Sequence, residues 1–227
     1  LIHLKSLIKD FDGLAKKYHS SPNYQHSHEG LVENLKDWSL FHSLDEVKKI
    51  FIKKREKCKM SVEEIPIKLL DEWNVDKKTG NISHKSDDFF IIHGLKVKSE
   101  KREITTSWTQ PILSQVGFDG GILGIVRKRF HDIPHYLCEF KEEPGNYGKV
   151  QISPTLQATF ANLRQSHGGR KPHFSELFIN KKRDSSIKVL FDSWLAEDGG
   201  RLYLKRNKGI LLEVNDEYQL DIPNENF

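Results

Sequence analysis

The chain has 227 residues, of which 37% are hydrophobic and 30% charged, a balance that excludes a disordered, fibrous or collagen-like protein. The net charge of +4 is small and the two signs are mixed throughout, so the composition gives no support for nucleic acid as a partner. No apolar run approaches the roughly 18 residues of a membrane-spanning helix, and we expect no membrane contact.

The length and the cysteines narrow the class further. At about 150 residues per domain, the chain holds one large domain or two small ones. Cys58 and Cys138 stand alone, without a CxxC motif, which indicates no structural zinc and no disulfide framework and favours a reducing cytoplasm. The chain begins at Leu1 and its single methionine is Met60, so we expect further residues before Leu1.

The first 72 residues are predicted to form a helical segment. Ser43 and Glu46 have the spacing of a capping box at a helix start. Val47, Ile50 and Phe51 then recur at helical spacing. A second helix is expected over residues 61–70, although Pro66 leaves its start open.

From about residue 82 the pattern changes to short strands, so residues 73–227 are predicted to form a second domain and the chain an α+β protein. One helix is expected among the strands. It starts at Ser153, with Pro154 in the first helical position, and ends at Gly168. The strands are expected at residues 88–97, 104–108, 121–126, 134–141, 187–191, 201–205 and 210–214.

The strand over residues 134–141 carries the most informative face. Alternation places His135, Glu139 and Lys141 on one side, together with Leu137. A solvated outer face explains this pattern, and so does a cleft wall with an acid and a base. A Pro-Gly turn follows directly, and both interpretations stay open for it.

The expected helix start at Ser153 offers free backbone N–H groups, which suit a phosphate. Every helix has such an end, so this signal is weak alone. Gln157, Thr159 and Asn162 fall on the polar side of this helix, where they can bond a sugar or a base.

A Gly-Gly turn at Gly199 and Gly200 leads into the expected strand over residues 201–205. Alternation places Arg201, Tyr203 and Lys205 on one face, which can hold a diphosphate. A solvated basic edge strand gives the same pattern.

The tryptophans allow two interpretations, and several catalytic motifs are missing. Trp73, Trp108 and Trp194 lie near turns or strand ends, where they either pack in a core or stack on a nucleobase. The sequence has no P-loop, no GxGxxG and no GxSxG motif. Pro134 lies between His131 and His135, which argues against a helical metal pair.

Taken together and in order, several short runs resemble the NDP-hexose 2,3-dehydratase family. Each run is weak alone, but the ordered combination is specific and covers about residues 65–214. The runs are Leu70–Trp73, His84, Phe89–Phe90, Trp108–Ile112, Gly121–Gly124, Lys141–Asn146, Ser153–Thr159, Glu197–Arg201 and Lys205–Asn207.

The resemblance implies a fold, a reaction and a substrate. The fold is a nudix-like mixed sheet, here with an N-terminal helical segment, and the nudix hydrolase box with its metal-binding glutamates is not visible. The reaction removes water across C2 and C3 of a nucleotide-linked 4-keto-6-deoxyhexose, usually dTDP-4-keto-6-deoxyglucose. It needs no cofactor and no metal, because the C4 ketone activates the C3 proton.

The resemblance also implies site residues. Glu143 or His135 is expected as base or acid, and Lys141 as the stabiliser of developing charge. Trp73 is expected to stack on the base. The expected substrate-binding residues are Trp73, Trp108, Glu139, Asn146, Ser153, Pro154, Thr155, Gln157, Asn162, Glu197, Gly199, Gly200, Arg201, Lys205 and Arg206.

Three departures and two alternatives accompany the resemblance. Glu139 stands where the family more often has Gln, and Ala161 where Ser usually precedes Asn162. Family members usually carry two copies of the unit and this chain has one, so we expect a homodimer. A ketoreductase is expected downstream. The alternatives are a non-catalytic nucleotide-sugar-binding module and another lyase or isomerase of the same substrate class.

Overall fold

The computed structural model describes residues 13, 30, 33–34, 38–100, 107–131, 133–165, 168–181, 184–223 and 226–227. The chain divides into two compact units, Leu1–Ile52 and Lys53–Phe227. Most of the helical prediction for residues 1–42, and residues 104–106 of one predicted strand, lie outside the described residues. Within those residues, no helix is long and apolar enough to cross a membrane.

Helix α3 (Leu44–Lys57) begins where the sequence predicts. The Ser43 backbone N–H donates to Glu46 Oε2 at 2.7 Å, and the Glu46 N–H donates to Ser43 Oγ at 3.3 Å. This reciprocal pair is the capping box, and it satisfies two N–H groups that the first helical turn leaves without backbone partners.

The helix expected over residues 61–70 is wrong. Only a 3₁₀ turn, η1 (Ile67–Leu69), forms there. Pro66 has an extended backbone (φ −56°, ψ 137°) and disfavours helical geometry in the residue before it. The apolar residues of this segment, including Val62, Ile65 and Leu69, are exposed, so no packing surface stabilises a longer helix.

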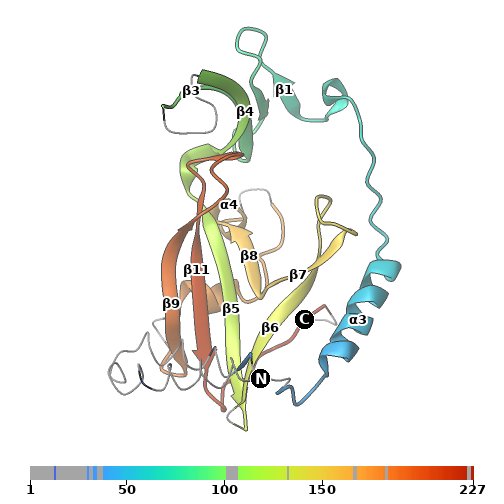
Figure 1. The fold of residues 1–227 in the computed structure, drawn as a ribbon, viewed down its shortest axis with the longest axis vertical. Helices are drawn as coiled ribbons and strands as arrows, with labels where there is room; N and C mark the ends of the chain where they lie inside the picture. The colour runs from blue at the N-terminus through green and yellow to red at the C-terminus, as the bar shows by residue number, and fades with distance from the viewer. Residues whose placement is uncertain are drawn as a thin grey trace. The chain divides into compact units, whose positions relative to one another are not determined.

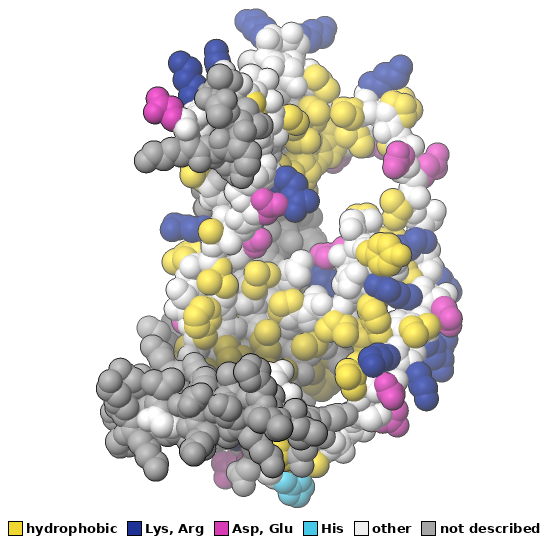
Figure 2. Space-filling view, in the orientation of Figure 1, with side chains coloured by type: hydrophobic (Ala, Val, Ile, Leu, Met, Phe, Trp, Pro, Cys, Tyr) yellow, Lys and Arg dark blue, Asp and Glu magenta, His cyan; other side chains and the backbone are white. Residues whose placement is uncertain are grey.

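One sheet has five strands in the order β1-β2-β3-β4-β10. Neighbours are antiparallel except β10, which runs parallel to β4. Hydrophobic side chains gather near the β1 end of this sheet in the view of Figure 2. The strands are β1 (Trp73–Val75), β2 (Ile82–His84), β3 (Phe90–Lys98), β4 (Ser107–Gln115) and β10 (Leu202–Tyr203).

The second sheet positions the candidate site. Its order is β7-β6-β5-β11-β9 (Figure 1). Strand β8 pairs with the first residues of β5, and β6 pairs with the later ones. Strands β5 and β11 run parallel, and the other pairs are antiparallel. The strands are β5 (Gly121–Phe130), β6 (Ile133–Glu142), β7 (Val150–Pro154), β8 (Leu156–Thr159), β9 (Ile187–Ala196) and β11 (Arg206–Val214).

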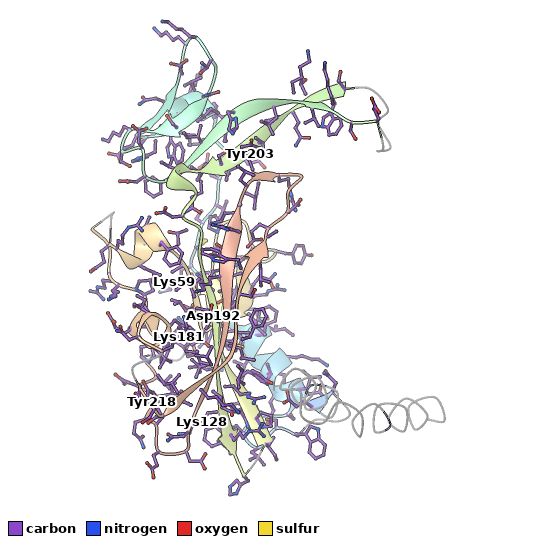
Figure 3. The ribbon with its side chains drawn as sticks, turned by 90° about the vertical axis from the view of Figure 1, so that its left-hand side faces the viewer. Lys59, Lys128, Lys181, Asp192, Tyr203 and Tyr218 are labelled. Atoms are coloured by element: carbon purple, nitrogen blue, oxygen red, sulfur yellow. The ribbon has the colours of Figure 1, made fainter. Side chains whose placement is uncertain are left out.

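The core lies on this second sheet. Val126, Leu212 and Phe178 are almost fully buried. Phe178 comes from the short helix α5 (Ser175–Ile179), and its ring lies where a Cβ at Gly124 would stand. The glycine in β5 therefore lets α5 pack close to the sheet. Beside this core, Lys181 forms an ion pair of 3.2 Å with Asp192 of β9 (Figure 3).

The helix predicted to start at Ser153 is wrong in its first half. Strands β7 and β8 occupy this stretch, and helix α4 (Phe160–Leu163) follows them. Leu156 and Ala158 are buried while Gln157 and Thr159 are half-buried, which is the period of a strand. Thr155 is 2% exposed; its hydroxyl accepts from Val126 N at 2.9 Å and donates to Leu137 O at 2.5 Å. These bonds tie the segment to β5 and β6.

Candidate functional site

A cavity of about 450 Å³ opens on the second sheet, where β5, β6 and β8 meet the start of β11. Residues of β5 and β8 line it as register partners: Leu123 pairs with Gln157, and Ile122 with Ala158. The lining combines apolar residues of β5 and β8 with charged groups on two sides. It consists of Ile122, Leu123, Lys141, Glu143, Gln157, Ala158, Thr159, Asn162, Glu197, Lys205 and Asn207.

Lys141 and Glu143 form the charged pair on one side of the cavity. Lys141 Nζ lies 3.6 Å from Glu143 Oε1 and donates to the Gln157 carbonyl at 3.0 Å. Gln157 Nε2 donates to the same Glu143 oxygen at 3.3 Å. A carboxylate is thus held beside an ammonium and an amide, an arrangement in which one group can accept a proton and another can stabilise negative charge.

The turn after β6 holds Glu143 in place. The Glu143 N–H donates to Lys149 O at 3.0 Å, and the Asn146 N–H donates to Glu143 O at 3.1 Å. Asn146 Nδ2 also donates to Lys141 O at 3.3 Å. Asn146 therefore supports the turn that carries Glu143, and it is not one of the residues that line the cavity.

The other charged side of the cavity contains Glu197, Lys205 and Asn207. Asn207 Nδ2 donates to Glu197 Oε1 at 2.5 Å. Lys205 Nζ donates to Gln115 Oε1. Burial lowers the pKa of Lys205, and the nearby Glu197 carboxylate partly opposes this shift. The cavity thus offers a second cation and a second carboxylate.

Glu139 lies on the same face of β6 as Lys141, two residues earlier. Burial raises the pKa of Glu139; Lys141 opposes this shift and Glu143 adds to it. Its side chain is not part of the cavity lining. Glu139 therefore contributes to the electrostatics beside the Lys141–Glu143 pair rather than to the wall itself.

Residues 44–227 match the model of a family described as NDP-hexose 2,3-dehydratase. The chain belongs to this family. The resemblance drawn from the ordered sequence runs is thereby confirmed.

Curated members of the dehydratase family extend well beyond this chain. A dTDP-4-dehydro-6-deoxy-α-D-glucopyranose 2,3-dehydratase of Saccharopolyspora spinosa is 38% identical over 153 residues, 67% of this chain and 30% of the relative. Enzymes of the same name from Streptomyces violaceoruber and Amycolatopsis orientalis are each 35% identical, over 67% and 78% of this chain and 33% and 37% of the relatives. The chain spans about a third of the length of these relatives.

Several site residues expected for this dehydratase family member come together in the cavity. Lys141 and Glu143 form one side, Lys205 and Glu197 another, and Gln157 and Asn162 also contribute. Thr159, which the sequence also offered as a partner for a sugar or a base, lies in the lining too. Asn207 was outside the expected set, although it stands in the run Lys205–Asn207. Ile122, Leu123 and Ala158 were missed because strand pairing, which sequence does not specify, brings them to the wall.

His135 lies away from this cavity. It precedes Lys141 by six residues on β6, which corresponds to about 20 Å at about 3.4 Å per residue. Its Nδ1 lies 2.9 Å from Ile133 O, and its ring packs edge-on against Phe130. Alternation correctly places His135 and Lys141 on one face, but the length of the strand separates them.

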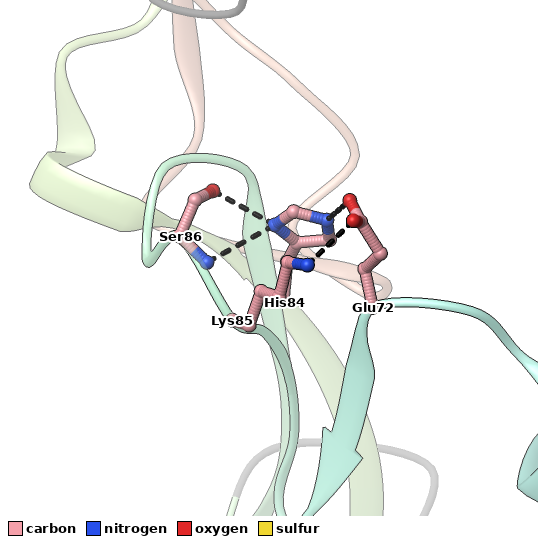
Figure 4. A network of polar contacts seen from close by, with 4 residues as sticks. All are labelled: Glu72, His84, Lys85 and Ser86. Atoms are coloured by element: carbon pink, nitrogen blue, oxygen red, sulfur yellow. Dashed lines mark hydrogen bonds and ion pairs between the residues drawn. The ribbon is translucent and has the colours of Figure 1, made fainter.

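The two tryptophans expected to bind substrate belong to the first sheet. Trp73 packs against Phe90 at 4.7 Å and against His84 at 5.4 Å between ring centroids. His84 Nδ1 lies 2.7 Å from Ser86 Oγ, and its Nε2 lies 3.2 Å from Glu72 Oε2 (Figure 4). Trp108 Nε1 donates to Gln110 Oε1 at 2.7 Å. Neither tryptophan lines the cavity.

The remaining expected binding residues lie in strands or turns outside the lining. Ser153 and Thr155 are buried, and Pro154 ends β7, so none of them caps a helix. The Gly199–Gly200 turn leads to Arg201. The guanidinium of Arg201 lies 2.6 Å from the Asp198 carboxylate, and its side chain is 84% exposed. The Arg206 guanidinium lies 4.4 Å from the Trp194 ring centroid. The predicted basic face therefore reaches the cavity only through Lys205.

No group of three or more His, Cys, Asp or Glu side chains suited to a metal ion occurs among the described residues. The charged groups of the cavity are two lysines and two glutamates. The chemistry available from these side chains is proton transfer and electrostatic stabilisation.

Proposed function

We propose that this protein eliminates water across C2 and C3 of a nucleotide-linked 4-keto-6-deoxyhexose, with dTDP-4-keto-6-deoxyglucose as the substrate. The observation that supports this most is the Lys141–Glu143 pair in the wall of a cavity large enough for a sugar. The family membership and the activity for which the three relatives are named support the choice of substrate.

The first step uses the acidity that the C4 ketone gives to the C3 proton. Glu143 accepts this proton, and the electron pair of the broken C–H bond moves toward C4 as an enolate. Lys141, 3.6 Å from Glu143, places its ammonium near the developing oxyanion. A positioned base typically contributes about 10²–10⁴-fold, and one oxyanion donor about 10²–10³-fold.

The second step expels the C2 hydroxyl. The enolate electrons form the C2–C3 double bond while the C2–O bond breaks, and protonated Glu143 returns its proton to the departing oxygen. The balance is the loss of one water, without an oxidant or a reductant. The product is an enol that becomes a 3-ketone, so we propose a ketoreductase as the next enzyme.

The polar residues of the other side suit the rest of the substrate. Asn162, Glu197 and Asn207 offer donors and acceptors to sugar hydroxyls. Lys205 offers a cation to the diphosphate. The pocket would thus orient the sugar ring with C3 toward Glu143, and this positioning is itself a source of rate enhancement.

Three broader features belong to the same proposal. We propose a nudix-like arrangement, which the mixed sheet with its parallel β5–β11 pair supports. A homodimer rests on the resemblance to proteins with two copies of the unit. A cytoplasmic setting is supported by Cys58 and Cys138, which are both free thiols.

A coupled assay tests the proposed activity. The protein is incubated with dTDP-4-keto-6-deoxyglucose, a ketoreductase and NADPH, and NADPH oxidation is followed by absorbance. Oxidation that depends on this protein supports the dehydratase. Saturable substrate binding without oxidation would instead favour the non-catalytic binding module.

A further inference from the structure

Gln115 contacts the cavity indirectly, through Lys205. It is the last residue of β4 and is 9% exposed. Its Oε1 accepts from Lys205 Nζ, and its Nε2 donates to the Gly120 carbonyl at 3.1 Å. Because both ends of the amide are engaged, its carbonyl oxygen stays directed at the lysine.

The backbone around Lys205 is fixed by separate contacts. Leu204 has a left-handed conformation with φ 52°, which turns the chain between β10 and β11. The Lys205 carbonyl accepts from Glu197 N at 3.0 Å. Gly120 lies so close to β11 that an added Cβ would stand 2.5 Å from the Arg206 carbonyl oxygen. The position of the Lys205 ammonium is therefore fixed by contacts of the residue's backbone and by the hydrogen bond at the end of its side chain.

The two lysines of the cavity differ in the charge of their side-chain partner. Lys141 lies beside the Glu143 carboxylate, which compensates its charge. Lys205 contacts a neutral amide, which satisfies one N–H and leaves the positive charge uncompensated by that partner. The Glu197 carboxylate acts on Lys205 over a longer range, and it accepts a hydrogen bond from Asn207.

Building on the proposed function, we propose that Gln115 is a positioning residue that holds the Lys205 ammonium for the substrate diphosphate. A carboxylate in place of the Gln115 amide would form an ion pair with the Lys205 ammonium and compete with the diphosphate. An apolar side chain there would leave the ammonium without this hydrogen-bond partner. Gln115 thereby determines how strongly the cavity binds a nucleoside diphosphate, although it is not one of the residues that line the cavity.

The test is calorimetric titration of the folded protein with dTDP from neutral to alkaline pH. Diphosphate binding needs the charged lysine, so affinity falls as pH rises through the Lys205 pKa, which burial lowers. The other titratable groups of the cavity are Lys141, Glu143 and Glu197. Lys205→Met should weaken dTDP binding and remove this alkaline fall.

Two substitutions of Gln115 should move the fall in opposite directions. Gln115→Glu raises the Lys205 pKa, shifts the fall to higher pH and weakens dTDP binding at neutral pH by about ten-fold, which corresponds to about 1.4 kcal/mol. Gln115→Met removes the acceptor and shifts the fall to lower pH. Gln219→Glu, the same change at an exposed position outside the cavity, is the matched control and should leave dTDP affinity unchanged.

Several results would overturn this role of Gln115. They are absence of dTDP binding to the unaltered protein, equal pH midpoints in both Gln115 variants, and an unchanged effect of Gln115→Glu in the Lys205→Met background. If one Gln115 variant fails to fold by circular dichroism, the other variant and Lys205→Met still decide the question. Titration with dTDP needs no turnover, so failure of the elimination assay alone contradicts the proposed function and not this inference.

Discussion

At the scale of single residues, the candidate chemistry depends on a two-residue interval at the end of one strand. Lys141 is in β6 and Glu143 is the first residue after it, so an even spacing directs both side chains toward β8. There Gln157 contacts each of them, through its carbonyl and its amide. Lys141, Glu143 and Gln157, which come from β6, the residue after it and β8, thus form one polar group in the cavity wall.

Glu143→Gln tests the proposed base. The amide keeps the size of the side chain and cannot accept the C3 proton, so turnover should fall by about 10²-fold or more. Affinity for dTDP should change little, because the contacts that we propose for the diphosphate are made by Lys205 on the other side of the cavity. Turnover is measured by the coupled assay and affinity by titration.

Glu142→Gln is the matched control for this substitution. Glu142 is the neighbouring residue, is exposed and is not part of the cavity lining. Its turnover should remain that of the unaltered protein. Equal losses in the two variants, or full activity of Glu143→Gln, would remove Glu143 from the catalytic role.

The sequence predicted part of this site, for an identifiable reason. Lys141 and Glu143 could be found because they stand in one run, and Glu197 and Lys205 because they flank a Gly-Gly turn. Gln115 could not be found, because its role depends on contact with a residue 90 positions away. Trp73 fits an aromatic cluster equally well by sequence, and only the structure assigns it there.

At the scale of elements, the segment after β6 illustrates the competition between local and tertiary signals. Ser153, Pro154 and Thr155 have the local pattern of a helix start, yet they lie in and beside strands. The buried hydroxyl of Thr155 joins β5 and β6, which no local pattern expresses. Tertiary hydrogen bonds and burial outweigh the local preference here.

Thr155→Val tests this tie between the strands. The replacement keeps the shape and leaves the Val126 N–H and the Leu137 carbonyl without their buried partner. The free energy of unfolding in urea should fall by about 1–3 kcal/mol. Thr109→Val, at an exposed position of β4, should change it by less than about 0.5 kcal/mol. Equal stability of both variants would contradict this role of Thr155.

At the scale of the whole molecule, the chain matches a family whose curated relatives are about three times as long as the segment they share with it. The cavity is formed within the unit Lys53–Phe227, so its described residues come from one copy of the chain. We propose that a second copy completes the assembly. The broad α+β class was predictable from patterning, whereas the pairing of β11 with β5 needed the structure.

Light scattering coupled to size exclusion tests the assembly. The proposed homodimer predicts twice the mass of one chain at the concentrations used for the activity assay. Dilution should lower the mass as the dimer dissociates, and a parallel fall in specific activity would show that the second copy contributes to the reaction. A stable monomer with full activity would remove the dimer from the account.

The elimination itself is the most direct test of the central claim. Purified protein is mixed with dTDP-4-keto-6-deoxyglucose without a ketoreductase, and the C2 and C3 protons of the sugar are followed by NMR. The account predicts loss of the C3 proton signal together with conversion of C2 to a deoxygenated position, and neither change with Glu143→Gln. Unchanged C2 and C3 signals in the presence of folded protein that binds dTDP would contradict it.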